Sequence, residues 1–147
     1  MGLLFTYLGI ALIFSFLCSI LEAALLSTTP IYINMKLKEG RKFAMQLSHL
    51  KSNIDLPLSA ILTLNTIANT MGAAVAGASA AVVFGKENLV WFSIFFTLSI
   101  LLFSEILPKT AGVAYAKKFA PWIAMPLQGL VKIMRPLIWL CQAVTRL

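Results

Sequence analysis

Three long stretches of this chain, at about residues 3–27, 56–84 and 89–108, are almost free of charged side chains. A membrane-spanning helix needs about 20 mostly apolar residues, so each stretch is long enough to cross a bilayer. The composition agrees, because 60% of the 147 residues are hydrophobic and only 12% are charged. Soluble domains are about 45–50% apolar and about 25% charged. We therefore expect an all-α membrane protein with three transmembrane helices.

The positive charges indicate how these spans are oriented. Eleven of the twelve Lys and Arg residues lie between the first two stretches or after the third, and only Lys86 lies between the second and third. Because positive loops stay on the cytoplasmic side, the sequence predicts an N-out, C-in topology. The first stretch has no Lys or Arg before it, which is typical of a retained span. The net charge of +7 requires no nucleic-acid partner, since so apolar a chain offers little surface for one.

Two further segments are expected to form amphipathic juxtamembrane helices. Between about residues 31 and 52, apolar residues recur at helical spacing among five cations, and Gly40 is expected to split this segment in two. The tail, about residues 119–147, contains three prolines together with Lys132 and Arg135. Cations are costly at the middle of a bilayer, so a broken interfacial helix is favoured over a fourth span.

The polar residues inside the spans follow a helical pattern. Each of them needs a partner, a cavity or an ion, because polar groups are expensive in a bilayer. Within the first two spans their spacings of three or four residues place each set on one helix face. A rise of about 1.5 Å per residue puts Ser19, Asn65, Asn69 and Glu105 at similar levels in the inner half of the membrane, whereas Glu22 lies near the cytoplasmic end of its span and could be half solvated. We therefore expect three helices to converge on one polar site. The polar residues of the three spans are Ser15, Ser19, Glu22, Asn65, Asn69, Ser104 and Glu105.

This polar set offers oxygen atoms only. Pro108 has no N–H group for the carbonyl of Ser104, four residues earlier, so that carbonyl is free beside Glu105. Carboxylate, amide, hydroxyl and carbonyl oxygens suit Mg²⁺, Ca²⁺ or Na⁺, and they argue against zinc or copper. Secondary transporters hold cations with similar free carbonyls of broken helices. The pattern therefore predicts a cation site at membrane depth.

Helix packing offers an alternative explanation for several of these residues. The serines can bond back to carbonyls of their own helix, and Asn65 and Asn69 can hold neighbouring helices together. The small residues of GAAVAGASAA at 72–81 are interpreted as allowing close helix contact. Glu105 has Lys109 four residues further on as a possible ion-pair partner. These interpretations remain open at the level of sequence.

Enzymatic activity is not expected. The serines have no histidine or buried lysine at helical spacing that would activate them as nucleophiles. The single histidine, His49, forms no metal cluster and is given no functional role. No Gly-rich phosphate loop is present.

A channel is also disfavoured, because the outer half of the spans has few possible ligands. This asymmetry between the two halves predicts a cavity that opens inward.

Three motifs resemble the transmembrane domain of the CorC / cyclin-M (CNNM) magnesium transporters: SFLCSILE at 15–22, LNTIAN at 64–69 and SEILPK at 104–109. The resemblance covers nearly the whole chain, and the third motif is the most specific. It implies a multi-pass homodimer of three-span subunits, surrounded by lipid in the cell (inner) membrane. Such a protein exports Mg²⁺ in exchange for Na⁺ and holds a largely dehydrated Mg²⁺ between its three helices.

The resemblance also implies residue roles. Glu22 and Ser104 would belong to the region of the coupling ion, and Asn65 would line the Mg²⁺ site. The chain departs from the family pattern at Ile20, where Gly is common, and at Thr66, where a second Asn is common. The ligands, or residues in ligand-bearing turns, would be Ser15, Ser19, Asn69 and Glu105.

The family also bears on domain organisation. Its members continue into a paired CBS module that binds nucleotide and regulates transport, and no such module is expected here. No repeat or linker divides residues 1–147, so we expect one transmembrane domain excised from a longer protein. The alternative function is a non-transporting dimeric membrane anchor or Mg²⁺ sensor, in which the polar residues serve helix packing alone.

Overall fold

The structure of this chain, a computed structural model, describes residues 2–146. Within these residues the regular secondary structure is helical and no strand is present, which confirms the all-α class. The elements are α1 (Gly2–Ser27), α2 (Pro30–Lys38), α3 (Lys42–Ser52), α4 (Asp55–Phe84), the 3₁₀ turn η1 (Lys86–Asn88), α5 (Leu89–Ser99), the π-helical segment η2 (Ile100–Ile106), α6 (Leu107–Ala114) and α7 (Ala116–Thr145).

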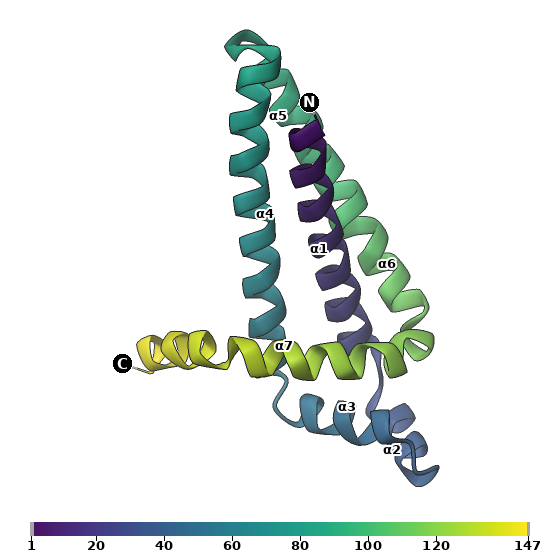
Figure 1. Cartoon of the computed structure of the whole chain (residues 1–147). Helices are drawn as coiled ribbons and strands as arrows, with labels where there is room; N and C mark the ends of the chain where they lie inside the picture. Colours follow the sequence, from purple (N-terminus) through teal and green to yellow (C-terminus); the bar gives the residue numbers. More distant parts are fainter. Residues whose placement is uncertain (1, 147) are drawn as a thin grey trace.

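Three helical rods stand side by side in Figure 1: α1, α4 and the continuous run of α5, η2 and α6. They contain 26 residues, 30 residues and, counted from Lys86 to Ala114, 29 residues, and each is apolar and long enough to cross a membrane. Helix α1 packs against both other rods. A turn at Gly85, with φ of 78°, joins α4 to the third rod. The three predicted spans are therefore helical, and the third extends beyond residue 108 to Ala114.

Small residues allow α1 to approach the other rods closely. A Cβ atom on Gly72 of α4 would collide with the Cβ of Ala11. A Cβ atom on Gly112 of α6 would lie 2.7 Å from the Cβ of Ala23. Gly77, in contrast, has no atom within 4 Å of the corresponding position. Of the two glycines in GAAVAGASAA, Gly72 is thus the one that permits helix contact.

Helices α2 and α3 form a short hairpin beside the end of α1. The side chain of Thr29 caps α2 by accepting a hydrogen bond from the backbone N–H of Tyr32. Gly40, with φ of 73°, separates the two helices, as the sequence predicts. The Lys51 ammonium donates a hydrogen bond to the carbonyl of Thr28, which ties α3 to the end of α1. Burial lowers the pKa of Lys51.

Helix α7 differs from the broken tail helix that the prolines predict. It runs without interruption from Ala116 to Thr145 although it contains Pro121, Pro126 and Pro136. Figure 1 shows it lying crosswise over the ends of the three rods. It packs against α1, α3 and α4. These contacts support one face of the helix, which compensates for the backbone hydrogen bonds that the prolines cannot donate.

The three faces of α7 have different chemistry. One face is buried against the rods, and a second is apolar but exposed, with Trp122 and Leu140 as examples. A third face carries Gln128, Lys132 and Arg135, which follow one another at intervals of four and three residues. By length and composition α7 is a fourth candidate span within residues 2–146. Its polar stripe and its crosswise position, however, are features of an interfacial helix.

Buried apolar side chains form two clusters at opposite ends of the rods. The larger cluster lies where α1, α3, α4 and α7 meet. The smaller one contains Leu4, Ala76 and Phe96, near the N-terminal end of α1. Two buried serines, Ser15 and Ser19, lie on the stretch of α1 that connects these ends. The fold therefore places polar groups between two apolar layers.

Candidate cation site

Buried polar side chains are few in this molecule. Among residues 2–146 the buried polar residues are Ser15, Ser19, Thr28 and Ser104. Three of these four are residues that the sequence analysis places at the polar site. A buried hydroxyl group is costly without a hydrogen-bond partner, so the partners of these serines define how the site is built.

The first pair joins α1 to α4. The Ser15 hydroxyl donates a hydrogen bond to Oδ1 of Asn65 over 2.8 Å. Asn69, one turn further along α4, lies with its Nδ2 at 3.5 Å from the same oxygen, which is at the limit of a hydrogen bond. Ser15, Asn65 and Asn69 therefore lie together between α1 and α4.

The second pair joins α1 to the third rod. The Ser19 hydroxyl donates a hydrogen bond to the backbone carbonyl of Ser104 over 2.6 Å. In an α-helix this carbonyl would accept from the N–H of residue 108, which Pro108 lacks. The Ser104 hydroxyl in turn approaches the carbonyl of Leu12 at 3.4 Å. Because Ser15 and Ser19 lie one turn apart on α1, all three rods contribute oxygen atoms to one region.

The third rod changes its helical geometry at this level. Residues Ile100–Ile106 form the π-helical segment η2, which contains both Ser104 and Glu105. At its end the backbone N–H of Leu107 donates to the carbonyl of Leu102, five residues earlier. Such segments are rare and occur frequently at functional sites. This π-helical segment was not predicted, and its only local signal in the sequence is Pro108 within an otherwise apolar helix.

Glu105 is half-buried and extends from η2. None of the ion pairs between described residues involves Glu105. The expected alternative, a pair between Glu105 and Lys109, is therefore not formed. Instead, Nζ of Lys109 lies 3.3 Å from Oε2 of Glu22. Lys109 thus pairs with Glu22 of α1, and not with Glu105 of its own rod, because α1 and α6 pack closely at Gly112.

Glu22 consequently lies apart from the serine pairs. It follows Ser19 by three residues toward the α7 end of α1, and 16% of its side chain is exposed. Its partner Lys109 is more open, with 45% of the side chain exposed. The structure thus separates Glu22, in an ion pair between α1 and α6, from Glu105, which makes no ion pair within residues 2–146.

The surroundings of the site are apolar on the side of the α1 N-terminus. A pocket of about 250 Å³ between α1 and α4 is lined there by mostly apolar residues, among them Ala11, Phe14, Met71 and Gly72. Within residues 2–146 no three His, Cys, Asp or Glu side chains gather into a metal cluster. A cation between the rods would therefore be held mainly by hydroxyl, amide and carbonyl oxygens.

Comparisons with known proteins find similarity over nearly the whole length of the chain. A family model described as the cyclin M transmembrane N-terminal domain matches residues 7–147. The chain is 35% identical over 136 residues to a UPF0053 protein of Synechocystis, covering 92% of this chain and 39% of that protein. It is 32% identical over 143 residues to a UPF0053 protein of Haemophilus influenzae, covering 97% and 34% respectively.

A third relative is the UPF0053 inner membrane protein YfjD of Escherichia coli, which is 26% identical over 126 residues. That alignment covers 86% of this chain and 29% of the relative. The chain thus spans between 29% and 39% of the length of these curated relatives.

Proposed function

Since this chain belongs to the cyclin M transmembrane N-terminal domain family, we propose that it carries Mg²⁺ across a membrane. The proposed direction is export of Mg²⁺, coupled to entry of Na⁺. Mg²⁺ is here the transported ion, and it binds between α1, α4 and η2 in a largely dehydrated form. The proposed ligands are oxygens of Ser15, Ser19, Asn65, Asn69 and Glu105.

One observation carries this proposal: two inter-helix oxygen pairs already have the spacing of neighbouring Mg²⁺ ligands. Octahedral Mg²⁺ has ligand distances of 2.0–2.1 Å, so adjacent oxygens lie about 2.9 Å apart. The oxygen atoms of Ser15 and Asn65 are 2.8 Å apart, and those of Ser19 and the Ser104 carbonyl are 2.6 Å apart. Binding would then require the two hydroxyl hydrogens to turn away and the Asn69 amide, whose Nδ2 faces Asn65 Oδ1, to present its oxygen.

Charge also supports this assignment. A divalent cation that loses most of its water needs a negative ligand, and carboxylate oxygen is the hard ligand that Mg²⁺ prefers. Glu105 belongs to the same π-helical segment as the Ser104 carbonyl and is in no ion pair within residues 2–146. Glu22 has Lys109 as its partner. We therefore give Glu105 the ligand role and place Glu22 and the Ser104 side chain in the pathway of the coupling ion, while the Ser104 backbone carbonyl, beside Ser19, belongs to the Mg²⁺ site.

The proposed orientation is N-out and C-in, in the cell (inner) membrane. It is supported by the eleven cations on one side of the spans, and by the printed name of the Escherichia coli relative, which is an inner membrane protein. In this orientation α2, α3 and α7 lie at the cytoplasmic face, with the exposed apolar side of α7 against lipid.

The assembly is proposed from the family as well. We propose a homodimer whose longer form carries a regulatory CBS module. The length of the relatives is compatible with such a module, because the chain spans at most 39% of any of the three.

Flux measurements test the proposal directly. The chain is reconstituted into liposomes, and Mg²⁺ movement is followed with an enclosed indicator for wild type, Asn69→Ala and Glu105→Ala. Both variants are expected to lose transport. Thr66→Val is the matched control, because Thr66 is exposed on the same helix and bonds only to its own helix at the Leu62 carbonyl. Unchanged flux in both site variants would remove these residues from the site.

A second candidate function has one observation in its favour: the serines and Asn65 satisfy one another without an ion. In that case the chain is a non-transporting dimeric anchor or a Mg²⁺ sensor. Thermal unfolding in detergent separates the anchor from the transporter. The anchor predicts that Asn69→Ala lowers stability equally with and without Mg²⁺, whereas an ion site predicts loss of Mg²⁺-dependent stabilisation.

A further inference from the structure

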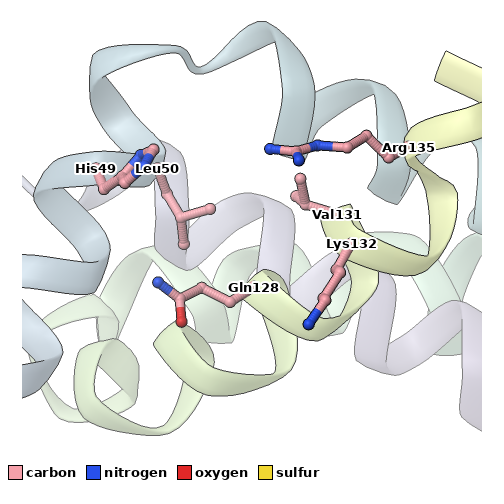
Figure 2. A pocket seen from close by; sticks show the side chains of 6 residues that line it. All are labelled: His49, Leu50, Gln128, Val131, Lys132 and Arg135. Carbon is pink, nitrogen blue, oxygen red and sulfur yellow. The ribbon is translucent and has the colours of Figure 1, made fainter. Parts of the chain in front are cut away.

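A pocket of about 270 Å³ lies outside the cation site, between the end of α3 and the middle of α7. Figure 2 shows the two sides of this pocket, with α3 on one side and successive turns of α7 on the other. The sequence alone indicates no functional role for His49, and only the fold brings the two segments together. The lining residues are His49, Leu50, Gln128, Val131, Lys132 and Arg135.

The polar lining of the pocket is rich in hydrogen-bond donors and carries positive charge. Lys132 and Arg135 are exposed cations, and neither is in any of the ion pairs between described residues. His49 and Gln128 add further N–H donors. No carboxylate lines the pocket. A guanidinium fork and an ammonium group that line one pocket are both groups that recognise phosphate oxygens.

The floor of the pocket is apolar. Leu50 and Val131 line it and are themselves buried. A free inorganic ion gains nothing from such a floor, whereas the glycerol part of a phospholipid can cover it. The volume of about 270 Å³ exceeds several times the roughly 30 Å³ that one water molecule occupies in the liquid. It is therefore large enough for a phosphoglycerol group.

The position of the pocket on α7 fits the same ligand. The exposed apolar face of α7 carries Trp122, Ile133 and Leu140, and Trp side chains gather at the membrane–water interface. Gln128, Lys132 and Arg135 lie on another face of the same helix. If the apolar face enters the acyl boundary, these polar residues lie at the level of the lipid phosphates. Basic pockets at the cytoplasmic side of membrane helices bind anionic headgroups.

We propose that this pocket binds the phosphate group of an anionic phospholipid of the inner leaflet. Lys132 and Arg135 hold the phosphate oxygens, and Leu50 and Val131 contact the glycerol part. The proposal uses the membrane position of α7 given under Proposed function, but it uses no residue of the Mg²⁺ site. Its consequence is that lipid composition influences how firmly α3 and α7 are held together.

Thermal unfolding of the purified chain in an uncharged detergent tests this proposal. The probe is short-chain phosphatidylglycerol, compared with phosphatidylcholine of the same chain length, glycerol 3-phosphate and inorganic phosphate. We expect saturable stabilisation by phosphatidylglycerol only, which weakens as salt is added. The double variant Lys132→Gln/Arg135→Gln is expected to bind about twenty-five-fold more weakly, since each cation near a lipid surface contributes about a factor of five.

Two controls keep the result specific. Lys38→Gln/Lys42→Gln removes the same charge from two exposed residues of α2 and α3 that lie outside the pocket lining, and it is expected to leave binding within about twofold. Lys132→Arg/Arg135→Lys keeps the charge and is expected to retain most of the binding. Mg²⁺ binding is measured on the same variants and is expected to be unchanged, so this proposal and the transport proposal can fail separately.

The proposal is overturned if the pocket variant and the matched control respond to phosphatidylglycerol in the same way, because the attraction is then a general effect of net charge. Equal stabilisation by inorganic phosphate or glycerol 3-phosphate would contradict the claim that the bound phosphate belongs to a phospholipid. Equal stabilisation by phosphatidylcholine would overturn recognition of an anionic headgroup.

Discussion

At the scale of single residues, the most informative contact is the one between the Ser19 hydroxyl and the Ser104 carbonyl. Only the acceptor of this hydrogen bond is predictable from the sequence, because Pro108 has no N–H for that carbonyl. The donor that replaces it comes from another helix, and sequence spacing cannot identify it. The same holds for Lys109, whose nearest acidic neighbour in sequence is Glu105 but whose partner in space is Glu22.

Ser19→Ala is expected to lower the stability of the protein even when no Mg²⁺ is present. The substitution leaves the buried Ser104 carbonyl without its hydrogen-bond donor, which costs about 1–3 kcal/mol. The measurement is thermal or denaturant unfolding in detergent, in the absence of Mg²⁺. The control is Ser99→Ala, because the exposed Ser99 hydroxyl bonds only to the Phe95 carbonyl of its own helix. Equal stability of the two variants would show that the inter-helix bond contributes nothing.

At the scale of helices, the spans were predictable because their length and hydropathy are local properties. The interruption at Gly40 was predictable for the same reason. The continuity of α7 was not, because contacts with α1, α3 and α4 outweigh the effect of Pro121, Pro126 and Pro136. The π-helical segment η2 was also not predictable, since α-helical and π-helical turns share the same apolar pattern.

Gly112→Ala is expected to lower stability by about 1–3 kcal/mol, because the added methyl group overpacks the contact between α1 and α6. Its Cβ would lie 2.7 Å from the Cβ of Ala23 and 3.1 Å from the carbonyl oxygen of Ile20. The matched control is Gly77→Ala, where the Cβ enters open space. Alanine is the better helix former by about 1 kcal/mol, so this control is expected to be neutral or slightly more stable in unfolding experiments.

Pro108→Ala tests the link between helix geometry and the ion. The alanine N–H supplies the donor that the Ser104 carbonyl lacks, so the third rod is expected to be at least as stable as in the wild type. Mg²⁺-dependent stabilisation is expected to decrease, since that carbonyl then has a competing partner. The control is Pro126→Ala, an equivalent change inside α7. A Mg²⁺ response that survives Pro108→Ala unchanged contradicts the role of the freed carbonyl.

At the scale of the whole molecule, the charge distribution predicts which end faces the cytoplasm. In a Cys141→Ser background, whose remaining Cys18 is buried, a cysteine at Lys86 is expected to react with an impermeant maleimide added to intact cells. A cysteine at Lys38 is expected to react only after the membrane is made permeable. Both parent residues are exposed, so accessibility in the fold is matched. The reverse labelling pattern would contradict the N-out, C-in topology.

The arrangement of the whole molecule also shows why the position of the site could be predicted from the sequence, while its hydrogen-bond partners could not. Depth along each span follows from counting residues, so the convergence of Ser15, Asn65 and Ser104 was predictable from the sequence. Which atoms pair depends on helix rotation and on close contacts such as Gly72 with Ala11. These follow from the fit of all three rods together, and the basic pocket between α3 and α7 arises in the same way.

The central claim is that oxygens of three helices bind Mg²⁺, and isothermal titration calorimetry of the purified chain tests it most directly. Wild type, Asn65→Ala and Thr66→Val are titrated with Mg²⁺, and wild type also with Ca²⁺ and Na⁺. Our account predicts saturable Mg²⁺ binding by wild type and Thr66→Val, and at least about tenfold weaker binding by Asn65→Ala. Equal Mg²⁺ affinity in all three proteins, or no binding by wild type, would contradict it.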